Sequence, residues 1–235
     1  MKIAVLKETQ EGERRVAATP ETVKKLIESG FEVLVQNEAG IPASIRDSDY
    51  EKAGAVMEEK AESLYQKAGI YLKVQKPLSG EMKSFKEGAV LIAFLHPLAS
   101  PDLIRELAAK KITAFAMEMI PRIARAQKMD ALSSQSNIAG YKAVMLAANA
   151  SGKLFPLLMT AAGTIQPARV LVLGAGVAGL QAIATAKRLG ARVEAFDTRP
   201  VVKEQVESLG ARFISLEIQE KETEDKGGYA KELSE

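Results

Sequence analysis

Two short segments of the chain carry residues whose types and spacing could do chemistry. The first is GAGVAG, in which Gly174, Gly176 and Gly179 stand between an apolar run and a helix-like segment. The second is RIARAQKMD, residues 122–130, which holds two arginines, a glutamine, a lysine and an aspartate but no histidine or cysteine. The glycine pattern is typical of a turn that binds phosphates. The polar segment offers donors and acceptors that could orient a ligand, and its spacing alone is equally that of a solvated connector.

Each glycine of the first segment has a role in a dinucleotide-binding turn. Gly174 permits a tight turn, Gly176 lets a pyrophosphate approach the backbone, and Gly179 lets the following helix pack closely on the sheet. Free N–H groups and the positive end of the helix dipole then hold the phosphates. We therefore predict that these glycines, with Ala175 and Val177 between them, bind a dinucleotide. The alternative is a tight turn that binds nothing.

An acidic residue follows the turn at the spacing such a site requires. Asp197 ends the next predicted strand, 18 residues after Gly179. It is expected to accept hydrogen bonds from the adenosine ribose and to repel a 2′-phosphate, which favours NAD(H) over NADP(H). Arg199 lies two residues further on and works against this preference, because arginine pairs with phosphate.

The elements that must position these residues alternate between strand-like and helix-like patterns. Strands are expected at KIAVL, FEVLVQ, GIYLKV, AVLIAFL and ITAFAM, and again at RVLVLG, RVEAFD and RFISL. Helices are expected at TPETVKKLIESG, SPDLIRELAAKK, VAGLQAIATAKRLG and PVVKEQVESLG, and a long one at residues 133–152. This alternation predicts an α/β fold with parallel sheets and crossover helices.

The pattern predicts two domains. Residues 1–132 form an N-terminal α/β domain, residues 133–163 a connecting helix and linker, and residues 164–235 the first half of a Rossmann dinucleotide-binding domain. A complete domain of that kind has two such halves, so the second domain is expected to be truncated and to bind NADH more weakly than a complete one. The polar stretch at residues 217–235 is expected to be a surface loop.

Composition excludes several classes of function. A net charge of +2 gives no basic field for nucleic acid, and the absence of cysteine excludes disulfides, thiolate metal sites and a cysteine nucleophile. No metal site is predicted. No apolar stretch reaches the length of about 20 residues that a membrane span needs, so the chain itself is expected to be soluble.

Nearly the whole chain resembles the NAD(H)-binding domain of proton-translocating NAD(P) transhydrogenase, the N-terminal part of its α subunit. The resemblance is carried by TAFAMEMIPRIARAQKMDALSSQSNIAGYKAV, by MTAAGTIQPARVLVLGAGVAGLQAIATAKRLGARVEAFD and by the N-terminal KETQEGERRVAATPETV. It implies an oxidoreductase in which NADH on this domain passes hydride to NADP+ on a partner domain, coupled by a membrane domain to proton movement. It also implies a homodimer attached through its partners to the cytoplasmic side of the membrane.

The family's polar loop lies over the nicotinamide end of the cofactor, and by position its functional residues fall on Arg122, Gln127, Asp130 and Ser133. Hydride transfer between two nicotinamides exchanges no proton with the protein, so it needs no general acid or base. Holding the two rings in the right orientation can lower the activation barrier by roughly 7 to 11 kcal/mol at the limit. Gln127 is expected at the junction of the two nucleotides, and Val177 against the nicotinamide ring.

Alanine dehydrogenase, related in fold, is the alternative enzyme. Arg15 and the sole histidine, His96, occupy the places of its substrate arginine and its acid/base histidine, but Gln75 stands where that family has a lysine. Without the ammonium group a charge that orients a 2-oxo acid is missing. We therefore expect His96 to be a structural residue at a strand end, and Arg14 and Arg15 to form structural pairs. A nucleotide-binding module without turnover is a third possibility.

Overall fold

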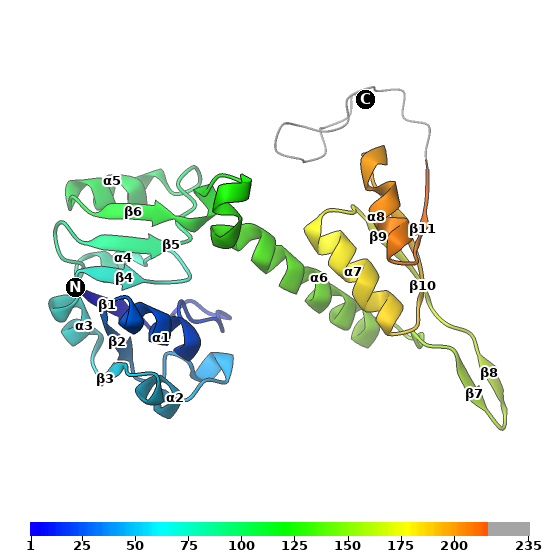
Figure 1. Ribbon diagram of the computed structural model, residues 1–235, viewed down its shortest axis with the longest axis horizontal. Coiled ribbons are helices and arrows are strands. Elements are labelled where there is room, and N and C mark those ends of the chain that lie inside the picture. The colour runs from blue at the N-terminus through cyan, green and yellow to red at the C-terminus, as the bar shows by residue number, and fades with distance from the viewer. Residues whose placement is uncertain (216–235) are drawn as a thin grey trace. The chain divides into compact units, whose positions relative to one another are not determined.

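The computed structural model describes residues 1–215, and it divides into two compact units, Met1–Met129 and Asp130–Glu235 (Figure 1). The predicted polar stretch at 217–235 therefore lies outside the described residues. The predicted α/β fold with parallel sheets in two domains is confirmed.

The first unit is a parallel sheet of six strands in the order β3-β2-β1-β4-β5-β6. The strands are β1 (Lys2–Val5), β2 (Glu32–Gln36), β3 (Val56–Glu58), β4 (Ile70–Leu72), β5 (Val90–Ala93) and β6 (Thr113–Ala116). The helices are α1 (Pro20–Glu28), α2 (Asp47–Lys52), α3 (Ala61–Lys67), α4 (Ser79–Met82) and α5 (Pro101–Ala109). The sheet order reverses between β1 and β4, which is where parallel α/β sheets bind ligands.

Helices cover both faces of this sheet because its strands alternate between two cores. Ile3 and Val5 face a core shared with Val23 of α1 and Tyr50 of α2. Ala4 faces the opposite core, which contains residues of α3 and α5. Helix α1 begins as its sequence predicts, with the Thr19 side chain accepting a hydrogen bond from the Thr22 N–H and proline in the first turn.

The second unit begins with the long helix α6 (Ala131–Ala150) and an antiparallel hairpin of β7 (Leu158–Thr160) and β8 (Gly163–Ile165). A parallel sheet follows, in the order β11-β10-β9. It consists of β9 (Arg169–Leu173), α7 (Val177–Arg188), β10 (Arg192–Phe196), α8 (Lys203–Ser208) and β11 (Arg212–Phe213). This strand–helix–strand–helix–strand run is the predicted mononucleotide-binding half.

One face of the second sheet carries the core of this unit. Val193 and Ala195 of β10 are buried together with Ile183 of α7, Val206 of α8 and Val144 of α6. Along β9, which is the last strand in the sheet order, the residues of the other face are exposed: Leu171 to 54% and Leu173 to 74%.

The sequence did not predict α2, β3, α3, α4 or the β7–β8 hairpin. Three of these five are short strands or a single helical turn, whose apolar patterns are too brief to show a period. Helix α6 also begins two residues earlier than expected, because Asp130 is its N-cap.

Candidate functional site

The glycine turn joins the end of β9 to the start of α7. Gly174 has a φ of +92°, a conformation that favours glycine, and its N–H donates to the Phe196 carbonyl of β10 at 2.8 Å. A Cβ on Gly179 would lie 1.8 Å from the Gly174 carbonyl oxygen. Only glycine at position 179 therefore allows α7 to start so close to the strand.

The space beside Gly176 is open, in contrast to the close contact at Gly179. Gly176 is the N-cap of α7, and a Cβ added there would meet no atom within 4 Å. Val177 follows as the first residue of the helix and is 42% exposed. The turn thus presents the N-terminus of a 12-residue helix beside an open cradle, which is the geometry that accepts a pyrophosphate.

Asp197 follows β10 and is tied to the turn. Its Oδ2 accepts the backbone N–H of Ala175 at 2.7 Å, and its carboxylate also accepts three hydrogen bonds from Arg199. Burial raises the pKa of the Asp197 carboxyl, but the hydrogen bonds from Arg199 and Ala175 outweigh burial and hold that pKa below its ordinary value. Asp197 is therefore a carboxylate that is paired within the chain.

The polar segment RIARAQKMD is divided between the two units. Residues Ala124–Met129 form a short 3-10 helix in which Ala126 is buried, and Arg122 and Gln127 are exposed. Asp130 and Ser133 belong to the second unit, where they are brought together. Asp130 caps α6: its carboxylate accepts the Ser133 N–H at 2.8 Å and the Ser133 hydroxyl at 2.6 Å.

Gly140 is a residue whose importance the sequence analysis missed. It lies in the middle of α6, and a Cβ there would come within 2.1 Å of the Ala178 carbonyl oxygen in the first turn of α7. The long helix therefore packs directly against the helix that starts at the glycine turn. An isolated glycine inside a strongly helical segment was the signal that could have revealed this contact.

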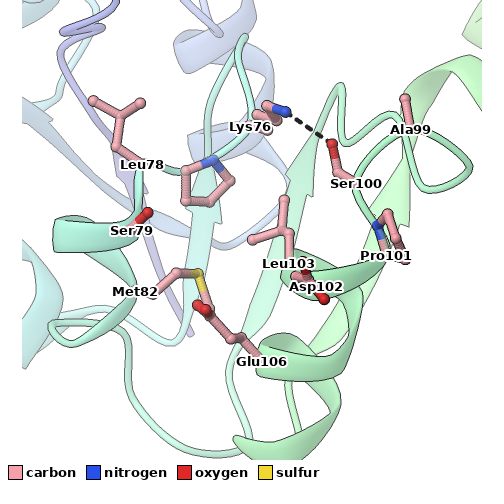
Figure 2. Close-up of a pocket in the computed structure, with 11 residues that line it drawn as sticks. Lys76, Leu78, Ser79, Met82, Ala99, Ser100, Pro101, Asp102, Leu103 and Glu106 are labelled. Atoms are coloured by element: carbon pink, nitrogen blue, oxygen red, sulfur yellow. Dashed lines mark hydrogen bonds between the residues drawn. The ribbon is translucent and has the colours of Figure 1, made fainter.

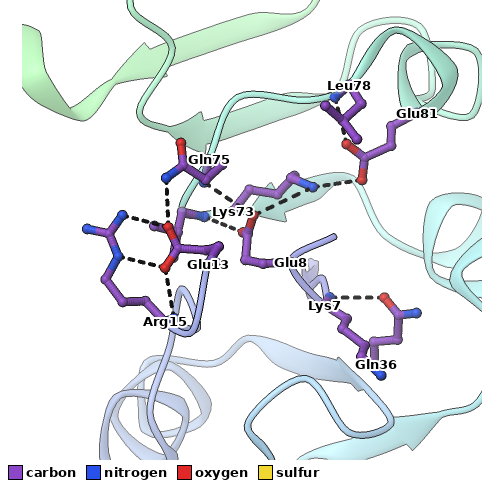
Figure 3. Close-up of polar contacts among 10 residues, drawn as sticks. Lys7, Glu8, Glu13, Arg15, Gln36, Lys73, Gln75, Leu78 and Glu81 are labelled. Carbon is purple, nitrogen blue, oxygen red and sulfur yellow. Dashed lines mark hydrogen bonds and ion pairs between the residues drawn. The ribbon is translucent and has the colours of Figure 1, made fainter. Parts of the chain in front are cut away.

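The first unit gathers charged side chains where β1 and β4 end (Figure 3). Glu8 accepts the N–H groups of Val74 at 2.6 Å and Gln75 at 3.3 Å, which ties the two strand ends together. The buried ammonium group of Lys73 lies 2.7 Å from Glu81 and 4.0 Å from Glu8. Burial raises the pKa of the Glu8 carboxyl against the lowering influence of Lys73.

Arg15 is held by Glu13 in this same cluster. The Glu13 carboxylate accepts hydrogen bonds from Arg15 Nε at 2.9 Å and Nη2 at 2.7 Å, and from the Gln75 amide at 2.7 Å (Figure 3). These bonds make Arg15 the structural pair that the sequence predicts. His96, three residues after the end of β5, is exposed. Its backbone N–H donates to Glu118, and its ring stacks on that of Phe94 with the ring centroids 6.5 Å apart.

Two hollows accompany these sites. In the first unit, a cavity of about 310 Å³ lies between α4 and α5, where Lys76 donates a 2.8 Å hydrogen bond to Ser100 (Figure 2). In the second unit, a groove of about 500 Å³ runs along α7 and α8, lined by Val177, Leu180 and Gln205 among others. Val177 therefore lines both the glycine turn and this groove.

Residues 1–215 hold no group of three or more acidic or histidine side chains placed to bind a metal ion. Over the same range, no helix is long and apolar enough to span a bilayer.

Comparison with known proteins decides the family. The family model described as "Alanine dehydrogenase/PNT, N-terminal domain" matches residues 4–139, and its partner, "Alanine dehydrogenase/PNT, C-terminal domain", matches residues 143–230. The chain belongs to the alanine dehydrogenase/PNT family. The glycine turn lies in the C-terminal match, and the charged cluster around Glu8 lies in the N-terminal one.

Among individual relatives, the chain is 53% identical to the first part of the NAD(P) transhydrogenase subunit alpha of Rhodospirillum rubrum, over 100% of this chain and 63% of that protein. Identity is 49% to NAD(P) transhydrogenase subunit alpha of Haemophilus influenzae, over 100% of this chain and 45% of that protein. Alanine dehydrogenase of Methanococcus maripaludis is 34% identical, over 84% of this chain and 53% of that protein.

The solved structure of the transhydrogenase from Sinorhizobium meliloti matches with a TM-score of 0.89 and 49% identity, over 92% of this chain and 62% of that one. The predicted resemblance to the transhydrogenase α subunit is thereby confirmed. The chain spans less than two thirds of the length of these relatives.

Proposed function

We propose that this chain is the NAD(H)-binding part of a proton-translocating transhydrogenase. The observation that carries the proposal is the glycine turn: Gly179 is required by contact with Gly174, Gly176 leaves open space, and α7 begins there. This turn stands in a chain that is 53% identical to a protein named as the first part of an NAD(P) transhydrogenase subunit alpha.

The residues of the turn fit a dinucleotide. The open side of Gly176 admits a pyrophosphate, and the first N–H groups of α7 would donate to its oxygens. Gly174, Ala175 and Val177 complete the backbone around it, and Asp197 braces that backbone through the Ala175 N–H. When bound, the nicotinamide group of the cofactor supplies hydride-transfer chemistry.

In this proposal the polar segment orients the cofactor. Arg122 and Gln127 are exposed on the first unit, and their side chains are of the types that hydrogen-bond a carboxamide and a ribose. Asp130 is the N-cap of α6 and binds Ser133 in its first turn, so the pair sets where that helix begins. None of these four side chains has to accept or release a proton in the proposed reaction, because hydride transfer between two nicotinamides depends on their orientation.

The proposal extends to partners. NADP(H) is held on a separate NADP-binding domain, and a membrane domain of the same enzyme couples hydride transfer to proton translocation. In this arrangement the chain sits on the cytoplasmic side of the membrane as a homodimer and is attached through its partners. The name of the Rhodospirillum rubrum relative, which makes it one portion of a subunit alpha, supports an assembly of several subunits.

Alanine dehydrogenase activity is the competing function, supported by the relative with that name at 34% identity. Against it, Gln75 occupies the expected lysine position and its amide is bound to Glu13. Titration of NADH fluorescence against the full chain, followed by an assay of NAD+-dependent alanine oxidation, separates the two. We expect NADH binding without alanine oxidation. Turnover of alanine, or no binding of NADH, would contradict the proposal.

A further inference from the structure

The Asp197 carboxylate is saturated by donors of its own chain. Oδ1 accepts the Arg199 N–H at 2.8 Å and Arg199 Nε at 2.9 Å. Oδ2 accepts the Ala175 N–H at 2.7 Å and Arg199 Nη2 at 2.9 Å. A carboxylate has about four lone-pair sites, so these four bonds fill them.

The pair is also buried. Asp197 is 7% exposed and Arg199 is 9% exposed, so solvent screens their interaction little. The guanidinium group meets the carboxylate with two N–H groups, one to each oxygen, the geometry of a strong and specific ion pair. Asp197 and Arg199 together therefore present no net charge to a ligand at the end of β10.

A ribose hydroxyl that approaches Asp197 must displace one of these donors. Two of them, the N–H groups of Ala175 and Arg199, belong to the backbone and are fixed by the turn. The Arg199 side chain is the donor that can move, and a displaced guanidinium group stays next to the ribose.

The intervening residue has hydrogen-bonding capacity left over. The Thr198 hydroxyl oxygen is buried and, within residues 1–215, makes no hydrogen bond. Buried polar atoms are rarely without a partner unless a ligand or water supplies one. This supports a ligand at the end of β10, independently of the ion pair.

We propose that Arg199 is a specificity-determining residue of the dinucleotide site: it neutralises Asp197 and sets how strongly the site distinguishes NADH from NADPH. The inference rests on the proposed function, since it requires a dinucleotide at the glycine turn. A free carboxylate repels a 2′-phosphate, whereas Arg199 offsets that repulsion and can pair with the phosphate.

The test measures dissociation constants of NADH and NADPH for the full chain and for Arg199→Met. Loss of a charge-assisted hydrogen bond to the phosphate predicts that the NADPH-to-NADH ratio of these constants rises at least about tenfold, with NADH binding unchanged or tighter. Arg192→Met, at the exposed beginning of the same strand β10, is the matched control and should leave the ratio unchanged.

A second pair of variants covers the case in which Arg199→Met fails to fold. Asp197→Asn releases the guanidinium group and should lower the ratio of the NADPH to the NADH dissociation constant about tenfold. Adding Arg199→Lys, which loses the planar fork but keeps the charge, should raise that ratio part of the way back. An unchanged ratio in Arg199→Met, or in Asp197→Asn when that variant alone folds, overturns the inference. If the unaltered chain binds neither nucleotide, the proposed function itself fails.

Discussion

The Asp197 carboxylate accepts the Ala175 N–H at 2.7 Å, so the acid that follows β10 braces the backbone of the turn that follows β9. Ala175 follows β9 and Asp197 follows β10, two neighbouring parallel strands whose carboxyl ends meet at one edge of the sheet. The acidic residue is therefore part of the frame of the turn as well as a candidate contact for the ribose.

Gly176→Ala should leave stability nearly unchanged, whereas Gly179→Ala should lower it. Gly176→Ala adds a methyl group to open space, so thermal unfolding should change little while NADH affinity falls strongly, because the methyl fills the pyrophosphate cradle. Gly179→Ala places a Cβ against the Gly174 carbonyl and should destabilise the second unit by about 1–3 kcal/mol.

Differential scanning calorimetry and NADH titration on the two variants check this contrast. Gly152→Ala, where a Cβ also meets nothing within 4 Å, is the matched control for Gly176→Ala. Normal NADH binding by Gly176→Ala would show that the open space beside the turn is not the phosphate site.

Substitutions of Asp130 should distinguish its role as the N-cap of α6 from any role in hydride transfer. Asparagine caps helices as well as aspartate does, so Asp130→Asn should keep the stability of α6, whereas Asp130→Ala should lose about 0.5–2 kcal/mol. If the charge of Asp130 also orients the cofactor, Asp130→Asn should slow hydride transfer at unchanged stability. Urea unfolding together with a transhydrogenation assay gives both values, and full activity in Asp130→Asn would limit this residue to capping.

Glu13 should make the stability of the first unit depend on pH. The hydrogen bond from Arg15 lowers the pKa of Glu13 to about 2 from an ordinary value of 4.5, so its contribution is complete above about pH 4.5 and is lost as the pH falls toward 2. Because the Arg15 side chain is partly exposed, we expect this contribution to be only about 1–2 kcal/mol.

Glu13→Gln should lower the free energy of unfolding at pH 7 and flatten its decline between pH 5 and pH 2, measured by urea unfolding across that range. The exposed Glu11 gives the matched control, Glu11→Gln, which should leave the curve unchanged. A Glu13→Gln chain with the original pH dependence would assign that dependence to other carboxylates.

Gln127→Asn should slow hydride transfer about tenfold or more while changing NADH affinity little, since a side chain shortened by one carbon misplaces the two reactants without removing a major binding contact. Gln66→Asn, on the exposed side of α3, is the control. Steady-state transhydrogenation with the NADP-binding partner and a parallel NADH titration measure the two effects. Undiminished activity would show that Gln127 does not orient the reaction.

Much of the fold follows from local patterns. Thr19 and Pro20 predict the start of α1, and the alternation of side chains along β1 places Ile3 and Ala4 in opposite cores. The glycine turn could be predicted because its glycines are close together in the sequence, with Gly174 at a positive φ and Gly179 against the Gly174 carbonyl. These features depend on residues that are neighbours in the sequence, so one sequence is enough to predict them.

The remaining features depend on contacts between distant residues. Glu8 reaches the N–H groups of Val74 and Gln75, and Gly140 lies against Ala178, yet nothing in either local sequence specifies its partner. The bidentate pairing of Arg199 with Asp197 was equally hidden, because spacing shows that the two are close but not that the acid is saturated.

The central claim is tested most directly with NADH carrying deuterium at the transferable position of the nicotinamide. The full chain, mixed with its NADP-binding partner and NADP+, should pass the deuterium to NADPH with no hydrogen drawn from water. Mass spectrometry of the NADPH formed reads the result. Full retention of the label is the outcome we predict, whereas exchange of the label with solvent, or no transfer to NADP+ by a chain that binds NADH, would contradict a reaction governed by orientation alone.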